Sequence, residues 1–124
     1  MDEYNKSLIK RWHDSRVFNL EKDRFKQKRI ISTEITPIDS YSMTSKSLYP
    51  YLLADTFNRY FKMCGENIYY IIGIDTASYV SYSFLSNHYL DSKNMLKEYL
   101  DVLNIMGVGF DYESRKWFCS QRNW

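Results

Sequence analysis

The sequence predicts one α+β domain over residues 1–124, an antiparallel four-stranded sheet with two helices on one face, preceded by a short N-terminal helix. The 124 residues fit a single domain, and 44% hydrophobic residues suffice for a core. Three segments carry apolar residues at helical spacing, and others alternate or run apolar as strands do. The predicted order is β-α-β-β-α-β, a ferredoxin-like arrangement. We expect residues 1–27 to form a helical, basic leader and residues 28–120 the sheet-and-helix core.

The first half of the chain predicts two helices and one strand. Residues 3–13 place Leu8 and Trp12 at helical spacing. Residues 29–36 alternate β-branched side chains, which predicts a strand that ends at Pro37. A longer helix is expected to begin at Pro50 and to stop at Gly65. Its apolar stripe, which we expect in the core, consists of Tyr49, Leu52, Leu53, Phe57, Tyr60, Phe61 and Cys64.

The second half predicts three strands and one helix. Residues 67–75 run apolar, as a central strand does. Residues 79–85 alternate, which predicts a strand returning antiparallel. Asp91 or Ser92 would cap a helix that ends at Gly107. Residues 108–120 would complete the sheet as a bent strand or a terminal hairpin.

Composition and motifs argue against catalysis and membrane insertion. The net charge of +2 creates no overall attraction to DNA or membranes. No apolar run of about eighteen residues exists, and no secretory signal is recognisable, so we expect a cytoplasmic protein without membrane association. Neither the two cysteines nor His13 and His88 have metal-ligand or redox spacing, and no Gly-rich phosphate loop is present. We therefore expect no enzyme, catalytic residue, metal or cofactor.

One segment resembles part of a nuclease family. Residues 71–83 resemble the first hairpin of ribonuclease H-like and RuvC-type nucleases, in which an apolar strand ends in Gly-x-Asp and a second strand returns. The resemblance implies that Asp75 ligates a divalent ion, with further carboxylates from Asp101, Asp111 and Glu113. A metal-dependent nuclease remnant is therefore a remote alternative function. A turn that favours Asp at its first position explains the same residue.

A basic run suggests a nucleic-acid-binding module as the alternative function. Residues 22–29 hold five Lys or Arg side chains and one acid, and such runs bind phosphates. Tyrosines on an open sheet face would stack on bases, as in RNA-recognition domains, although the Gly-aromatic consensus strand of those domains is absent. The candidate residues are Lys22, Arg24, Lys26, Lys28, Arg29, Tyr69 and Tyr79.

The first hypothesis is a small non-enzymatic protein-binding module, such as an inhibitor or accessory subunit of a larger enzyme. The chain has 12 Tyr and 3 Trp, residue types enriched at interface hot spots. Its Lys-, Asn-, Ile- and Tyr-rich composition would suit an AT-rich bacterium, phage or mobile element. The expected partner is a protein, and a homodimer through an exposed Tyr face stays open. The candidate interface residues are Trp12, Tyr70, Tyr82, Trp117 and Trp124.

Overall fold

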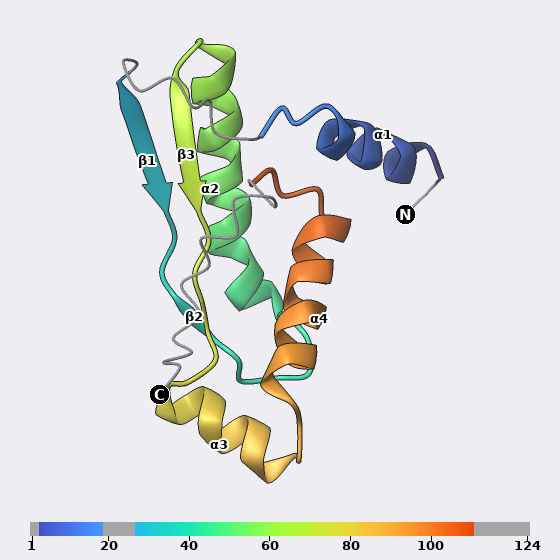
Figure 1. The fold of residues 1–124 in the computed structure, drawn as a ribbon, viewed down its shortest axis with the longest axis vertical. Helices are drawn as coiled ribbons and strands as arrows, with labels where there is room; N and C mark the ends of the chain where they lie inside the picture. Colours follow the sequence, from blue (N-terminus) through green and yellow to red (C-terminus); the bar gives the residue numbers. More distant parts are fainter. Residues whose placement is uncertain (1–2, 19–26, 111–124) are drawn as a thin grey trace.

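The computed structural model describes residues 3–18 and 27–110, which form a mixed α/β fold of helices and short parallel strand pairs (Figure 1). The helices are α1 (Glu3–Asp14), α2 (Ser45–Met63), α3 (Tyr79–Asn87) and α4 (Ser92–Ile105). The strands are β1 (Lys28–Ser32), β2 (Thr36–Pro37), β3 (Asn67–Ile71) and β4 (Ile74–Asp75). β1 pairs with β3 and β2 with β4, both in parallel. The predicted antiparallel four-stranded sheet is therefore wrong.

The parallel pairing follows from the helix that connects the strands. After β2 the chain passes through α2 and enters β3 beside β1, and parallel neighbours need a long crossover of this kind. Residues 33–35 separate β1 from β2, whereas only residues 72–73 separate β3 from β4, so one extra residue bulges from the first strand. The Thr36 amide donates to the Gly73 carbonyl oxygen at 3.3 Å and resumes the ladder after this bulge.

α2 begins earlier than the sequence predicted. Thr44 is its N-cap, and its side chain accepts from the Ser47 amide while the Ser47 hydroxyl accepts from the Thr44 amide, a capping box. Pro50, the predicted first residue, lies inside the helix. The predicted stop is confirmed, since Gly65 follows the helix with a φ of +81°.

The predicted strand over residues 79–85 is wrong, because these residues form α3. Ser78 is the N-cap, and its hydroxyl accepts from the Ser81 amide at 3.3 Å. The fully buried Ser81 hydroxyl donates to the Asp75 carbonyl oxygen at 2.6 Å and accepts from the Ile38 amide at 2.9 Å. Ser78, which precedes the alternating segment, and Ser81 within it therefore start and anchor a helix.

The core lies where α2, the strands and α4 meet, and its fully buried side chains include Tyr51, Ile68, Tyr99, Leu103 and Val108. The Tyr51 hydroxyl donates to the Gly73 carbonyl oxygen at 2.7 Å. α4 starts after the N-cap Asp91 and is followed by Gly107 at a φ of +73°, as predicted. Residues 108–110 form no strand, and the rest of the predicted last strand lies outside the described residues.

Candidate functional site

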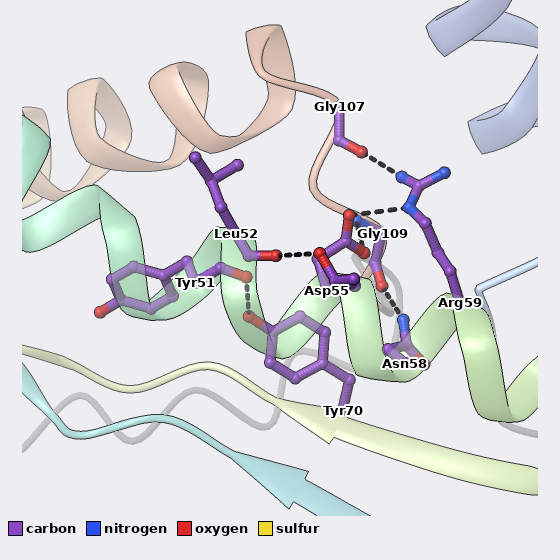
Figure 2. A network of polar contacts seen from close by, with 9 residues as sticks. Tyr51, Leu52, Asp55, Asn58, Arg59, Tyr70, Gly107 and Gly109 are labelled. Atoms are coloured by element: carbon purple, nitrogen blue, oxygen red, sulfur yellow. Dashed lines mark hydrogen bonds and ion pairs between the residues drawn. The ribbon is translucent and has the colours of Figure 1, made fainter.

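Three side chains of α2 hold the loop that follows α4 (Figure 2). Asp55 accepts from the Gly109 amide through Oδ1 at 2.9 Å and from Arg59 Nε through Oδ2 at 2.7 Å. Asn58 Nδ2 donates to the Gly109 carbonyl oxygen at 2.6 Å. Arg59 Nη2 donates to the Gly107 carbonyl oxygen at 2.5 Å. Because both backbone groups of Gly109 are bound by α2, the end of α4 is fixed against the βαβ unit.

A pocket of about 420 Å³ lies beside this network, between α1, α2 and the end of α4. Its polar side is formed by Asn5, Asp55 and Arg59. The guanidinium of Arg59 lies over the ring of Trp12 at 4.6 Å and over that of Phe18 at 4.8 Å. The apolar wall consists of Leu8, Ile9, Trp12, Ile105 and Met106.

α2 carries a second apolar surface that faces solvent. We define the outer face of α2 as five side chains that are between 44% and 81% exposed, Tyr49, Leu53, Phe57, Tyr60 and Met63. The first four were predicted to lie in the core, which is wrong, as is the buried position expected for Cys64. The inner side of the helix instead buries Tyr51, Ala54, Asp55 and Asn58. A helix that is buried on one side and carries apolar side chains on the other is typical of one covered on both sides.

An aromatic cluster joins the outer face of α2 to β1. Phe61 stacks against Phe57 with ring centroids 6.4 Å apart and meets the edge of Tyr60 at 5.3 Å. The guanidinium of Arg29 lies 4.2 Å above the Phe61 ring, and its Nε is 2.6 Å from Glu66 Oε2. Arg29 and Glu66 therefore form a charged border at one end of the apolar surface.

The predicted nucleic-acid-binding residues are not gathered on one sheet face. Lys28 and Arg29 begin β1, and Tyr69 is half-buried in β3. Tyr79 is 86% exposed at the start of α3, which lies at the opposite end of the strands from the beginning of β1 (Figure 1). The stacking platform expected from Tyr69 and Tyr79 therefore does not form. Three further candidates lie outside the described residues, Lys22, Arg24 and Lys26.

The predicted protein-interface residues are also dispersed. Trp12 is half-buried at the pocket, and Tyr82 is 69% exposed on α3. Tyr70 is buried and its hydroxyl donates to the Tyr51 carbonyl oxygen at 2.9 Å, so it supports the core. Trp117 and Trp124 lie outside the described residues. The outer face of α2, four of whose five side chains were expected in the core, was missed as a surface.

The candidate metal ligand Asp75 has a structural role. Its Oδ1 accepts from the amides of Ala77 at 2.8 Å and Ser78 at 3.0 Å, which turns the chain from β4 into α3. The returning strand that the nuclease resemblance implied is replaced by α3. Asp101 is exposed on α4, and Asp111 and Glu113 lie outside the described residues. Within residues 3–18 and 27–110, no three His, Cys, Asp or Glu side chains gather as a metal site, and no helix has the length and apolarity to cross a bilayer.

Comparison with known proteins identifies the fold. No protein-family model matches the sequence, and no curated protein matches it. Among solved structures, the chain is similar to part of the agnB2 LeuRS of Agrobacterium radiobacter K84, seen in a ternary complex with tRNA and LeuAMS. The TM-score is 0.83 at 12% sequence identity, over 94% of this chain. The chain spans only 15% of the length of that LeuRS, so it has the fold of one segment of a much larger protein.

Proposed function

We propose that this chain is a small non-enzymatic protein-binding module that docks on a larger protein through the outer face of α2. The observation that carries the proposal is the exposure of five adjacent apolar side chains on one helix, from Tyr49 to Met63. Contiguous exposed apolar surface of this kind marks interaction sites in proteins that otherwise fold as monomers.

The residue types on this surface support a protein partner. Aromatic residues, Met and Arg are enriched in interface cores, whereas Lys and Glu are depleted there. The outer face of α2 holds two tyrosines, one phenylalanine and one methionine, with Arg29 and Glu66 at its border. The partner surface would therefore be apolar at its centre and polar where it meets Arg29 and Glu66.

Two observations support a partner that covers more than the outer face of α2. Parallel sheets normally have both faces covered, yet Ile30 on β1 is 63% exposed. The same fold occurs in the LeuRS as a segment that makes up 15% of its chain. The rest of that chain is available to pack against the segment. Both observations suit a unit that completes its packing against a larger body.

The partner is first isolated as the protein that the wild-type chain retains from a lysate, and it is then purified. Equilibrium titration of this partner against the variants is the test. The double variant Phe57→Ser/Tyr60→Ser removes two aromatic rings one turn apart on the outer face. Tyr79→Ser/Tyr82→Ser is the matched control, since it removes two exposed rings at the same spacing on α3. We expect the first variant to weaken binding about 100-fold, as for two hot-spot residues.

The control variant should bind within about twofold of wild type, since surface changes away from the contact cost little. Equal affinity of both variants would contradict the proposal, as would a loss confined to the α3 variant. Light scattering on wild-type protein alone gives the remaining check. A dimer that Phe57→Ser/Tyr60→Ser dissociates would assign the surface to a second copy and overturn the larger partner.

A second candidate is nucleic-acid binding through the basic run at residues 22–29. The observation that favours it is the presence of tRNA in the complex of the LeuRS, one segment of which has the fold of this chain. Labelled oligonucleotides at about 50 and 200 mM salt test it by fluorescence anisotropy, because phosphate contacts weaken steeply with salt. Binding at the lower salt that falls at the higher salt and on Lys28→Ala would support it, and no binding at either salt would exclude it.

A further inference from the structure

The pocket between α1, α2 and the end of α4 has one polar side and one apolar side. Its volume of about 420 Å³ lies within the range of small-molecule sites, roughly 300–1,000 Å³. The apolar wall combines side chains of α1, such as Ile9, with Ile105 and Met106 at the end of α4. Gly107 also lines the pocket and lies close to Ile9, since a Cβ there would lie 3.3 Å from Ile9 Cγ1.

Arg59 presents unused donors to this space. Of its five N–H groups, one donates to Asp55 and one to Gly107, and no described residue accepts from Nη1. Figure 2 shows the remaining nitrogen of Arg59 pointing away from the Gly107 carbonyl and toward α1. Both oxygens of Asp55 are occupied, by Gly109 and by Arg59 itself. The polar side of the pocket therefore offers hydrogen-bond donors to a ligand.

The orientation of these donors is fixed before any ligand arrives. The guanidinium is held by two hydrogen bonds and lies over the rings of Trp12 and Phe18. A charged guanidinium N–H forms a strong hydrogen bond to a carboxylate oxygen, and prior ordering lowers the entropic cost of binding.

We propose that this pocket binds a small organic carboxylate with an apolar body, one carboxylate oxygen on Arg59 Nη1 and its body against Ile9, Ile105 and Met106. The site is separate from the outer face of α2, so it stands independently of the proposed protein partner. Asp55 offsets part of the charge of Arg59, which weakens the attraction for the carboxylate. The affinity therefore depends on the apolar body of the ligand as well as on its carboxylate.

The probe is 3-phenylpropionate. The control is 3-phenylpropanol, which has the same apolar body and an alcohol in place of the carboxylate. In ¹H–¹⁵N NMR spectra we expect 3-phenylpropionate to shift the Gly107 amide, the Trp12 indole N–H and the Arg59 Nε–H. The expected Kd is about 1 mM, as ligand efficiency allows for a molecule of this size. The alcohol should bind about tenfold more weakly. No shift of these signals at about 10 mM probe, or equal binding of the alcohol, would overturn the proposal.

Two exposed methionines provide a matched pair of variants. Met106→Glu places a carboxylate in the pocket wall, where we expect repulsion to weaken 3-phenylpropionate binding about tenfold. Met63→Glu makes the same change on the outer face of α2 and should leave the Kd unchanged. Unchanged binding to Met106→Glu would overturn the proposed position of the ligand.

Discussion

The side-chain amide of Asn58 donates to the carbonyl oxygen of Gly109 over 2.6 Å, although 51 positions separate the two residues in the chain. Asn58 is fully buried on the inner side of α2. Together with Asp55, which accepts from the Gly109 amide, it joins the end of α4 to the helix between the parallel strands. This connection also shapes the pocket beside α1.

Replacement of Asn58 by Ala should lower the free energy of unfolding by about 2 kcal/mol, because it leaves the buried Gly109 carbonyl without its donor. Urea unfolding monitored by circular dichroism measures the loss. Asn87→Ala is the control, since the Asn87 amide contacts the Ser83 hydroxyl on an exposed surface and should cost less than about 0.5 kcal/mol. Equal losses for the two variants would contradict the buried role of Asn58.

Gly107 and Gly65 should respond differently to Ala. Both have a positive φ, +73° and +81°, so each substitution carries a backbone cost of about 1 kcal/mol. A Cβ at Gly65 meets nothing within 4 Å, whereas one at Gly107 lies 3.3 Å from Ile9 Cγ1. Gly107→Ala should therefore destabilise the protein more than Gly65→Ala and increase hydrogen exchange in α1. Equal unfolding free energies and unchanged exchange in α1 would show that α1 does not pack on Gly107.

Tyr51 should make stability fall at high pH. Burial raises the pKa of the Tyr51 hydroxyl above its ordinary value of 10.0. Above pH 10 the unfolded chain loses this proton before the folded chain does, so stability falls by up to about 1.4 kcal/mol per pH unit until the folded pKa is reached. Below pH 10 the Tyr51 hydroxyl is protonated in both the folded and the unfolded chain, so its contribution to stability no longer changes with pH.

Tyr51→Phe isolates this effect. Urea unfolding between pH 8 and pH 11 should show wild type losing more stability than Tyr51→Phe above about pH 10. Tyr49→Phe is the control, since Tyr49 is exposed on the outer face of α2 and its removal should leave the alkaline slope unchanged. Parallel curves for wild type and Tyr51→Phe would contradict the buried, protonated hydroxyl.

The sequence predicted helices and strands well where one period extends over many residues. The apolar run at residues 67–75 corresponds to β3 and β4, and helices occur near residues 3–13 and after Asp91 as expected. The prediction was wrong over residues 79–85, where the alternating pattern indicated a strand and the structure has α3. Ser78 and Ser81 decide that segment, because one caps the helix and the other is buried against Asp75 and Ile38. Without this strand, the antiparallel pairing has no basis.

The candidate surface could not be predicted from the sequence because the most apolar stripe of α2 faces solvent and its buried side includes polar residues. Periodicity detects an apolar stripe, but it does not say whether that stripe or the opposite side of the helix packs against the strands. The choice depends on Asp55 and Asn58, polar residues that are buried because they bind Gly109. Their burial turns Leu53, Phe57 and Tyr60 outward. In such a helix, the rule that the apolar side is buried therefore predicts the wrong side.

The central claim is that the outer face of α2 is exposed to solvent in the isolated chain and is therefore available to bind a partner. Urea unfolding of Phe57→Ser/Tyr60→Ser tests it most directly, with no partner present. We predict a free energy of unfolding within about 1 kcal/mol of wild type, as expected for two surface substitutions. A loss of about 6 kcal/mol, as for two rings removed from a core, would show that these side chains stabilise the chain itself and would contradict the account.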